Sequence, residues 1–506
     1  MLDCTFDRFA ELAGEAASAG TAGARVVPVW REILFDFDTA VSAFARVRRS
    51  PFAFLLESAP AGSDTWARFT FLGTEPLSAW RLRDGVVEDW DAHRGWHSSR
   101  SPSDPLADLD ELISERNPVD VAGLGPFWSG AVGFFGYDIA RLIEKLPGGP
   151  EKTSTIPDAL FIFTRSVIVI DNLMSKARIV VSVPVPDSSQ ADLRNQFDEA
   201  VSEIDELERR LLAESPLKRL TFDSSAPPAT GKSSIGRDAF MKGVDRIKAY
   251  ITAGDCFQAL LARRIDIEAD FDSSVLYRAL RALNPSPYMY HLAFDGVELV
   301  GSSPELLVRL EDQRVSLRPI AGTRPRGATT ERDLELAREL LADPKERAEH
   351  IMLVDLGRND VGRVAKFGTV EVTELMKVEK YSHVFHIVSQ VEGDLAGEQG
   401  AIDVLRATFP AGTMTGAPKV RAMEIIDELE PVSRGAYAGA IGYIADGGKR
   451  MDLAITIRTC VIADGVASVQ AGAGIVADSV PETEWDETEN KARALLTAIG
   501  QARNAR

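Results

Sequence analysis

The sequence predicts an α+β fold in which large, mainly antiparallel sheets are flanked by helices. Runs of β-branched and aromatic residues are interspersed with segments of helical periodicity. Their order is too irregular for the strand–helix repeat of a Rossmann fold or a barrel. The chain has 506 residues, which is long enough for two or three domains and a large buried core.

Residues 1–215 are predicted to form strands, a hairpin and one long helix. Two β-branched runs around the polar sequence DNLMSK predict a hairpin over 160–185. Apolar residues from Leu193 to Leu207 recur every three or four positions, which predicts a helix over 189–214. A single helix packed on a sheet is favoured there over a coiled coil. The other strands predicted in this part are 26–33, 52–59, 67–73 and 78–91.

Residues 216–235 are rich in Ser, Pro and Gly, which predicts an exposed linker or long crossover. The remainder, residues 236–506, is predicted to be the second domain. It begins with a helix that ends at Gly254. The strands predicted after this helix, interleaved with further helices, are 256–267, 297–303, 306–312 and 315–322.

Charge and cysteine content narrow the class of function. The net charge of −19 disfavours nucleic acid or an anionic membrane as a partner. A small anionic substrate would need local cations or a metal. Cys4, Cys256 and Cys460 are widely spaced, which excludes a disulfide framework and predicts a reducing cytoplasm. The N-terminal sequence lacks a signal-peptide pattern, and the most apolar stretch is too short to span a bilayer.

An acidic sequence near the C-terminus, PETEWDETENK, raises the question of a metal site. Pro481 suits the first turn of a helix, and Glu484, Glu487 and Lys491 would then share one face. The simplest interpretation is a solvated face with a Glu487–Lys491 ion pair, worth a few tenths of a kcal/mol.

A second acidic pair lies upstream in LADPKERAEH. Asp343, Pro344 and Glu346 have the spacing of a capping box, so Glu346 has a purely structural explanation. Glu349 would share its helix face. If the two Glu-x-x-Glu pairs converge, their repulsion is roughly several kcal/mol, and a hard divalent ion such as Mg²⁺ or Ca²⁺ would remove it. Spacing alone leaves both interpretations open.

Longer sequence segments resemble the chorismate-utilising enzymes, almost continuously from about residue 235 to the C-terminus. These segments include SSPELLVRL, PIAGTRPRG, DPKERAEHIMLVDLGRND, YSHVFHIVSQV, FPAGTMTGAPKVRAMEIIDELEP, RGAYAGAIGYI, DLAITIRT and AGAGIVADSVPETEWDETENKA. The N-terminal half is similar more loosely, through FLLES, RFTFLG and GAVGFFGYD. Within this family the chain is most similar to the large subunits of anthranilate synthases.

The resemblance implies a Mg²⁺ ion among Glu346, Glu349, Glu484 and Glu487, holding the ring carboxylate of chorismate directly or through water. It also implies a set of substrate-binding groups: Gln258, Gly322, Thr323, Tyr437, Arg458, Gly472, Ala473, Gly474 and Lys491. For the glycines, backbone N–H groups can approach an anion closely. From the residues alone, a tight strand-to-loop bend at 471–474 is the alternative.

The resemblance also implies the catalytic groups. Glu305 matches the general acid that protonates the departing C4 hydroxyl, a role that needs a carboxyl protonated near neutral pH. His386 matches the active-site histidine, with a core histidine as the blander alternative and His383 as the fallback candidate. Thr323 matches a hydroxyl that contacts the substrate.

Two positions discriminate among members of the family. Gln258 stands where relatives that add water carry a lysine base. Ala321, in PIAGT, stands where aminodeoxychorismate synthases of the folate pathway carry a lysine nucleophile. The resemblance therefore implies ammonia attack and pyruvate loss to give anthranilate, the first committed step of L-tryptophan biosynthesis, with aminodeoxychorismate synthase as the alternative.

The expected partners follow from the same comparison. None of the three cysteines has the surroundings of a glutaminase nucleophile, so ammonia is expected from a separate glutamine amidotransferase chain in a hetero-oligomer. L-Tryptophan is the expected feedback inhibitor. The residues that resemble its site are Glu57, Ser58, Pro287, Tyr288, Met289 and Tyr290, with Pro287, Met289 and Tyr290 as the apolar wall; a core strand and turn is the alternative.

Overall fold

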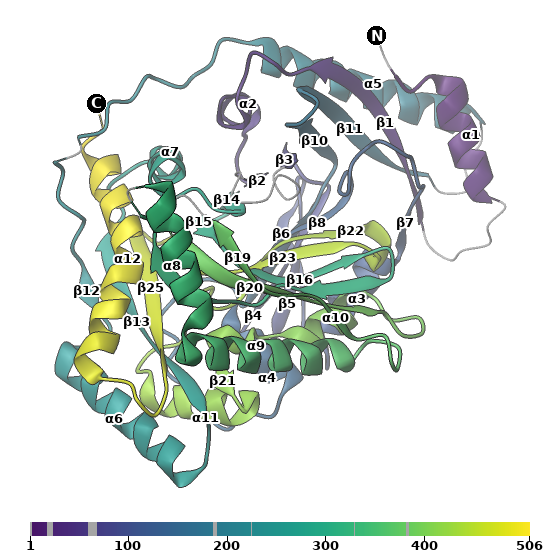
Figure 1. The fold of residues 1–506 in the computed structure, drawn as a ribbon. Helices are drawn as coiled ribbons and strands as arrows, with labels where there is room; N and C mark the ends of the chain where they lie inside the picture. The colour runs from purple at the N-terminus through teal and green to yellow at the C-terminus, as the bar shows by residue number, and fades with distance from the viewer. Residues whose placement is uncertain are drawn as a thin grey trace.

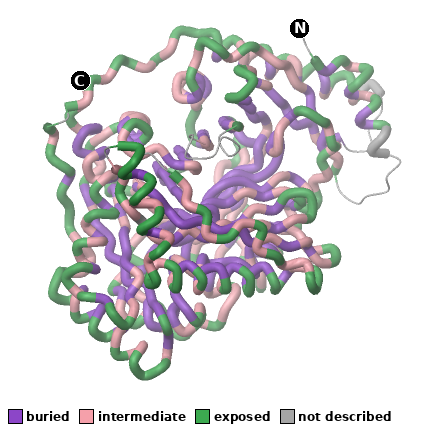
Figure 2. Tube along the Cα trace, viewed as in Figure 1, coloured by how far each residue is buried: buried purple, intermediate pink, exposed green. Residues whose placement is uncertain are grey.

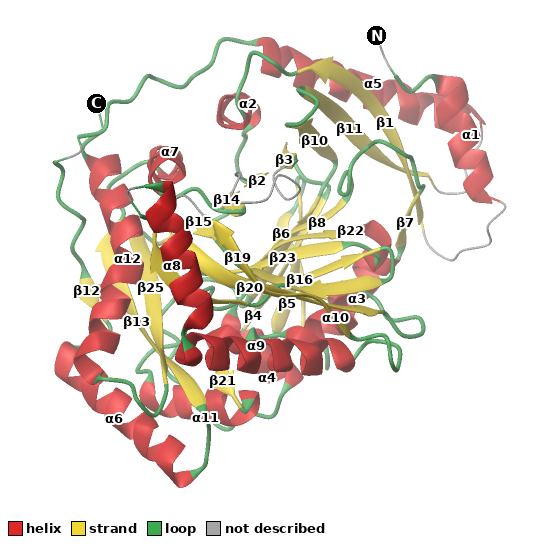
Figure 3. Cartoon of the chain, in the orientation of Figure 1, coloured by secondary structure: helices red, strands yellow, loops and turns green. Residues whose placement is uncertain are grey.

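The protein is described by a computed structural model. It covers residues 3–17, 24–58, 68–185, 190–223, 225–327, 329–380 and 384–505. Two large sheets lie at the centre, with helices on their outer sides (Figure 3). This arrangement confirms the predicted α+β class.

The first sheet has thirteen strands. Among the strands described, β1 and β7 form its one parallel pair, and every other neighbouring pair is antiparallel. Its strands in spatial order are β12 (Lys232–Ser233), β13 (Gln258–Glu268), β25 (Val466–Ile475), β24 (Thr459–Ala463), β15 (Val297–Ser303), β14 (Tyr288–Phe294), β2 (Ala53–Glu57), β3 (Phe69–Thr74), β10 (Ser166–Asp171), β11 (Lys176–Val185), β1 (Ala24–Leu34) and β7 (Arg116–Pro118), and β21 (Gly416–Ala417) pairs with β13.

The second sheet has twelve strands, and its described pairs are antiparallel. Its strands in spatial order are β18 (Ile320–Pro325), β20 (Val384–Asp394), β17 (Arg314–Leu317), β16 (Leu306–Glu311), β23 (Met451–Ile455), β22 (Ala440–Ala445), β8 (Gly130–Phe135), β9 (Ala159–Phe163), β4 (Ser78–Arg83), β5 (Val86–Asp91) and β6 (Gly95–Arg100), and β19 (Glu371–Lys380) pairs with β20.

Helices cover the outer faces of both sheets (Figure 1). The α-helices are α1 (Phe6–Ala17), α2 (Ala40–Val47), α3 (Pro105–Ser114), α4 (Ala140–Ile143), α5 (Gln190–Leu212), α6 (Arg237–Ala253), α7 (Ser273–Leu283), α8 (Thr330–Ala342), α9 (Pro344–Gly362), α10 (Ala401–Thr408), α11 (Lys419–Leu429) and α12 (Pro481–Arg503). The 3-10 turns are η1 (Tyr137–Ile139), η2 (Gly412–Met414) and η3 (Asp446–Gly448).

Burial is concentrated between and beside the sheets (Figure 2). One apolar cluster lies between the two sheets and takes side chains from both, among them Phe54 of β2, Tyr290 of β14 and Ile441 of β22. Separate clusters fill the space between each sheet and its helices. Since each strand alternates its side chains, strands buried on both faces are apolar at nearly every position.

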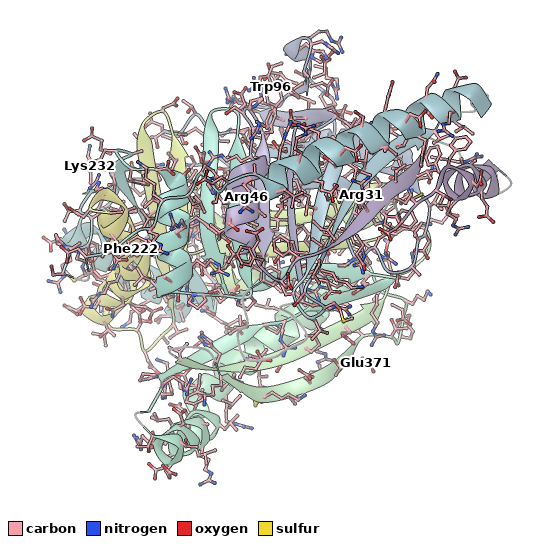
Figure 4. All side chains as sticks on the ribbon, turned by 90° about the horizontal axis from the view of Figure 1, so that it is seen from above. Arg31, Arg46, Trp96, Phe222, Lys232 and Glu371 are labelled. Atoms are coloured by element: carbon pink, nitrogen blue, oxygen red, sulfur yellow. The ribbon has the colours of Figure 1, made fainter. Side chains whose placement is uncertain are left out.

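The predicted helix after residue 189 is α5, which packs on β1 and β11 as expected. Arg31 of β1 reaches Asp205 of α5 at 2.8 Å (Figure 4). The predicted hairpin is β10 and β11, but the apolar run before it is β9, which belongs to the other sheet. Residues 315–322 likewise divide into β17 and β18. The chain leaves one sheet for the other at the polar residues 164–165, between β9 and β10. It changes its pairing within the second sheet at residues 318–319, which include a proline, between β17 and β18.

Each sheet joins one block of strands from the first predicted domain to one block from the second, at a single strand pair. In the first sheet, β14 pairs with β2; in the second sheet, β22 pairs with β8. Residues 213–223 and 225–231 form no helix or strand and run along the outside of the molecule between α5 and β12 (Figure 1). The boundaries 1–215, 216–235 and 236–506 therefore stay a prediction about sequence organisation.

No helix within the part of the chain described here is both long and apolar enough to cross a membrane.

Candidate active site

Glu305 lies in the short connection between β15 and β16, at the point where the chain passes from one sheet to the other. Its carbonyl accepts from the N–H of Ile455 at 3.0 Å, and the Ser303 hydroxyl donates to the Ile455 carbonyl at 2.7 Å. The side chain is 8% exposed. This double link to β23 fixes the backbone that carries the carboxyl.

Burial raises the pKa of Glu305 to about 7, against the opposing effects of the Thr413 hydroxyl and the charges of Arg458 and Lys491. A carboxyl with this pKa is about half protonated at pH 7 and largely protonated below it, so the acid form that a general acid requires is available near neutral pH. Because the charges of Arg458 and Lys491 oppose this shift, both residues lie near the Glu305 carboxyl.

Thr413 was not predicted as a site residue, although it lies in the motif PAGTMTGAP. It stands in the 3-10 turn η2, and its Oγ1 is buried beside Glu305 without a well-aligned hydrogen-bond partner. Thr413 and Glu305 line one cavity together with apolar side chains such as Leu353 and Leu356 of α9. A hydroxyl in such a motif is the sequence signal that could have identified it.

His386 lies on β20 and is 7% exposed. Its Nδ1 is 3.0 Å from the carbonyl oxygen of Gly322, so Nδ1 carries the proton and Nε2 keeps a lone pair. Burial lowers the pKa of His386 to about 4; the Gly322 carbonyl opposes this shift and the charge of Arg458 adds to it. The imidazole is therefore neutral near pH 7. His383 lies outside the described residues.

Gly322 stands at a bulge in the β18–β20 ladder with a φ of +64°. A Cβ there would lie 3.1 Å from Glu346 Oε2, so the backbone conformation and the close approach both favour glycine. Thr323 is the cross-strand partner of His386, while its side chain lies outside the described part of the structure. Three predicted site residues thus meet beside the first glutamate pair.

The two Glu-x-x-Glu helices form as predicted, as α9 and α12. Asp343 caps α9 by accepting from the N–H groups of Lys345 and Glu346. The predicted capping box is incorrect in its second half. The Asp343 N–H donates to Leu340, and Glu346 instead accepts from Arg324 at 2.9 Å.

The charges of the two glutamate pairs act on one another. Burial raises the pKa of Glu349, and the charges of Glu346 on the same helix and of Glu487 on the other helix raise it further. Burial also raises the pKa of Glu484, with Glu487 adding to the effect. Repulsion between carboxylates of two helices requires that the two pairs lie on the same side of the molecule, within range of each other's charge.

Cations hold two of these carboxylates. Arg324 pairs with Glu346 at 2.9 Å, and Lys491 pairs with Glu487 at 2.7 Å. The Glu487–Lys491 pair is thus present, as the simplest interpretation predicts. Across the described ranges, no three carboxylate, imidazole or thiol groups are arranged as they stand to hold a metal ion.

The chemistry of the glutamate cluster nevertheless fits a hard divalent ion. Its donors are all carboxylate oxygens, the kind of ligand that Mg²⁺ prefers. Two of the four, Glu349 and Glu484, carry pKa values raised by burial and by neighbouring negative charge. A bound cation would relieve that repulsion.

The sequence AGAG lies inside β25, so the predicted alternative of a strand-to-loop bend is wrong. Gly474 and Gly472 pair with Leu260 and Ala262 of β13. The N–H groups of those two β13 residues donate away from β25, to the Thr415 carbonyl at 2.8 Å and to a buried carboxylate at 2.9 Å. Antiparallel partners exchange both hydrogen bonds or neither, so Gly472 and Gly474 also turn their N–H groups away from β13.

On the side of β25 that faces away from β13, the neighbouring strand β24 pairs with β25 only as far as Val469. Lys491 Nζ donates to the Gly472 carbonyl at 2.9 Å, which brings the lysine to the same edge. The edge therefore offers backbone N–H groups beside a cation, an arrangement suited to a carboxylate. Ala473 lies between the two glycines and pairs with Leu261, so its backbone groups face β13 and its side chain lies in the core; the predicted contribution of Ala473 is therefore not available at this edge. Gln258 packs over Gly474, where a Cβ would lie 2.4 Å from its amide nitrogen.

Tyr437 is buried above an ion pair that the sequence did not reveal. Glu430 and Arg434 pair at 2.6 Å and are both nearly fully buried. The Arg434 guanidinium lies 5.8 Å from the centre of the Tyr437 ring. Burial raises the pKa of Tyr437, and Glu487 contributes to the rise, so the phenol stays protonated and lies near the glutamate cluster.

The strands that carry the predicted inhibitor residues meet. Glu57 of β2 is the cross-strand partner of Met289 of β14, and Ser58 follows β2. Both carboxylate oxygens of Glu57 already accept from Arg281, at 2.6 and 2.9 Å, and Tyr277 donates to one of them.

The predicted apolar wall needs correction. Met289 belongs to the core on one face of the sheet and Tyr290 to the core on the other, because successive residues of a strand alternate. A ligand on one face of β14 therefore contacts one of them. Tyr288 lies on the Tyr290 face, and Pro287 precedes the strand.

Comparison with known proteins agrees with this geometry. The model of the chorismate binding enzyme family matches residues 71–497. A protein of Acetivibrio thermocellus named anthranilate synthase component 1 is 44% identical, with 94% of this chain and 96% of that protein covered. The protein of the same name from Pseudomonas putida is 46% identical over the same shares.

Solved structures show the same likeness. Anthranilate synthase component I from Streptococcus pneumoniae superposes with a TM-score of 0.75 at 36% identity, covering 92% of this chain and 99% of that one. The menaquinone-specific isochorismate synthase of Escherichia coli has a TM-score of 0.67 at 20% identity, covering 97% and 99%, and shares the fold. The chain therefore belongs to the chorismate-binding enzyme family.

Proposed function

We propose that this protein is the synthase subunit of an anthranilate synthase, which converts chorismate and ammonia to anthranilate and pyruvate. The observation that carries the proposal is the buried Glu305 carboxyl, with a pKa of about 7, close to Arg458 and within the reach of Lys491. The names of relatives that are 42–46% identical over nearly the whole chain support it.

The reaction needs one acid and one acceptor. Ammonia adds at C2 of chorismate, the ring double bonds shift, and the C4 hydroxyl leaves as water with the proton of Glu305. The added ammonium group loses a proton to become the amine. Removal of the C2 proton then expels the C3 enolpyruvyl group and makes the ring aromatic, and the released enolpyruvate takes up a proton at its methylene carbon to become pyruvate. His386, neutral and with its Nδ1 proton donated to Gly322, has the Nε2 lone pair to accept a proton.

Two residues favour this product within the family. Gln258 is buried beside Gly474 and offers an amide where water-adding relatives have a lysine base. Ala321 is buried and has no nucleophile, which counts against the aminodeoxychorismate alternative.

We propose Mg²⁺ as the cofactor, with Glu346, Glu349, Glu484 and Glu487 as the residues that hold it. When bound, the ion would supply positive charge for the ring carboxylate of the substrate. Arg458, Lys491 and the N–H groups of Gly472 and Gly474 would bind and orient the same dianion. A chain with a net charge of −19 needs such a concentration of positive groups.

Ammonia is proposed to come from glutamine through a separate amidotransferase chain. All three cysteines are buried and free of disulfides. Burial raises the pKa of Cys4 to about 11 and that of Cys460 to about 12, and it also raises the pKa of Cys256. None has the thiolate character of a nucleophile. The free thiols also fit our proposal of a cytoplasmic location.

L-Tryptophan is proposed as a feedback inhibitor that binds where β2 meets β14. The support is the pairing of Glu57 with Met289, which joins the two predicted stretches. Because Arg281 already occupies the Glu57 carboxylate, the amino group of the ligand would have to share it. Binding there can inhibit only by favouring a less active conformation.

The direct test is incubation of the purified chain with chorismate, ammonium and Mg²⁺. The proposal predicts a fluorescent anthranilate product without any partner chain, and none after the metal is chelated. Accumulation of isochorismate or of an amino-chorismate without pyruvate would contradict it.

A further inference from the structure

Three neighbouring strands of the first sheet carry Tyr290, Gly301 and Thr459 in one row. Tyr290 of β14 is the partner of Gly301 in β15, which is in turn the partner of Thr459 in β24. The phenol oxygen of Tyr290 lies 2.6 Å from Thr459 Oγ1. The tyrosine side chain therefore crosses the whole intervening strand to reach the threonine.

Gly301 makes this crossing possible. A Cβ at that position would lie 2.2 Å from the Tyr290 ring and 2.6 Å from its hydroxyl oxygen. Tyr290 is 2% exposed and Thr459 is 6% exposed, so water does not compete for their hydrogen bond. A buried hydroxyl pair of this kind has strong directional preference.

The hydrogen bonds continue past Thr459. Its Oγ1 donates to the carbonyl of Ile457 at 2.8 Å, so the proton of the Tyr290 hydroxyl is the one shared between the two residues. We call this chain, from Tyr290 through Thr459 to Ile457, the hydroxyl relay. It closes a loop around the single residue between its last two members, which is Arg458.

Arg458 needs such support because its backbone is unfavourable. Its φ is +49°, in the left-handed region that residues with a Cβ rarely adopt. Its carbonyl accepts from the N–H of Ser302 at 3.2 Å. Residues held in this region by their surroundings occur often at functional sites, and the charge of Arg458 acts on both Glu305 and His386.

We propose that Tyr290 and Thr459 are positioning residues, which hold Arg458 in the backbone conformation that presents its guanidinium to a carboxylate of the substrate. This inference rests on the proposed function, in which Arg458 binds chorismate. The relay also begins on β14, so displacement of that strand by any ligand would act on Arg458 through two hydrogen bonds.

The test compares hydroxyl removal with hydroxyl retention. Thr459→Val removes the relay hydroxyl at nearly constant volume, Thr459→Ser keeps it, and Tyr290→Phe removes the first donor while leaving the ring over Gly301. Tyr443→Phe removes a phenol from the same core and is the matched control. The chorismate KM and kcat are measured with saturating ammonium and Mg²⁺.

Because the relay acts on substrate binding, Thr459→Val should raise KM about tenfold with kcat within about threefold. Thr459→Ser should restore most of the affinity, and Tyr290→Phe should raise KM by a smaller factor. The double variant Tyr290→Phe/Thr459→Val should be no weaker than Thr459→Val alone, since both changes break one chain. Tyr443→Phe should leave KM unchanged.

An unchanged KM in folded Thr459→Val or Tyr290→Phe would overturn the inference, as would additive losses in the double variant. If Thr459→Val fails to fold, Tyr290→Phe alone decides. If the wild-type chain forms no anthranilate, the proposed function fails separately, and calorimetric chorismate binding to the same variants then decides whether the relay positions Arg458.

Discussion

Glu349 of α9 and Glu487 of α12 lie close enough that the negative charge of Glu487 contributes, after burial and Glu346, to raising the pKa of Glu349. The two helices are far apart in sequence and are brought together by the fold. Opposed carboxylates of this kind are costly without a cation, and this cost underlies the first prediction.

Mg²⁺ should bind to the wild-type chain and raise its melting temperature, because the ion relieves repulsion among the four glutamates. Glu349→Gln and Glu487→Gln should each weaken Mg²⁺ binding at least tenfold in calorimetry. Glu482→Gln, on the exposed first turn of α12, is the control and should bind normally. Equal binding by all three variants would show that the ion, if bound, sits elsewhere.

Glu305→Gln should lower turnover by about 10²- to 10⁴-fold while the fold is retained, because the amide cannot donate the proton for the departing hydroxyl. The measurement is single-turnover formation of anthranilate, with circular dichroism to confirm folding. Turnover within threefold of wild type would remove Glu305 from the role of acid.

The activity of the wild type should depend on pH through the same carboxyl. The protonated form is the active one, and its pKa is about 7, so kcat/KM for chorismate should fall as pH rises through about 7. Free ammonia must be held constant in the measurement, because its own concentration rises with pH. If kcat/KM at constant free ammonia does not change between pH 6 and pH 8, the assignment of Glu305 as the acid is wrong.

The free energy of unfolding should also depend on pH through Glu305, and it should decrease as pH rises. The folded-state pKa of Glu305 is raised from 4.5 to about 7, so its contribution is fully present below the unfolded pKa and is lost as pH rises through 7. Glu305→Gln should therefore gain stability over wild type above pH 7, by up to roughly 3 kcal/mol. Denaturant unfolding at pH 4.5 and pH 8.5, which span the range between the two pKa values, measures the difference. A gain that does not grow with pH would contradict the buried-acid description.

Tryptophan inhibition should weaken in Glu57→Gln, at least tenfold in the inhibition constant, with ammonium-dependent turnover retained within about twofold. The amide removes the negative charge that an α-ammonium group would share with Arg281. Glu298→Gln is the control, because Glu298 is another carboxylate of the same sheet, on β15, and accepts from a buried histidine. An unchanged inhibition constant in Glu57→Gln would limit Glu57 to a structural role.

Local sequence rules predicted the helices well. Asp343 and Pro344 correctly mark the start of α9, and Gly254 correctly ends α6 in a left-handed conformation. Such features depend on a few neighbouring residues. The predicted capping box is absent because Glu346 pairs instead with Arg324. Arg324 is distant in sequence but near in space, so local spacing could not reveal it.

Strand pairing could not be predicted in this way. The apolar run around Arg165 contains β9 and β10, which belong to different sheets, and alternation within one strand does not say which partner it takes. For the same reason, the sequence did not show that Met289 and Tyr290 serve opposite faces, or that Tyr290 reaches Thr459 across Gly301.

The site residues were predicted through resemblance rather than from spacing. Periodicity gave the two glutamate pairs, but only the fold brings Glu349 near Glu487. Glu430 and Arg434 are only four residues apart, but their spacing does not show that they are buried beside Tyr437. The motif PAGTMTGAP offers the Thr413 hydroxyl, but only the fold places it beside Glu305.

The most direct test of the account is the fate of nitrogen and of the enol ether in one reaction. The purified chain is mixed with chorismate, ¹⁵N-ammonium and Mg²⁺, and the products are identified by mass spectrometry. The account predicts anthranilate that carries one ¹⁵N atom, together with an equal amount of pyruvate. Unlabelled isochorismate, or a labelled amino-chorismate without pyruvate, would contradict it.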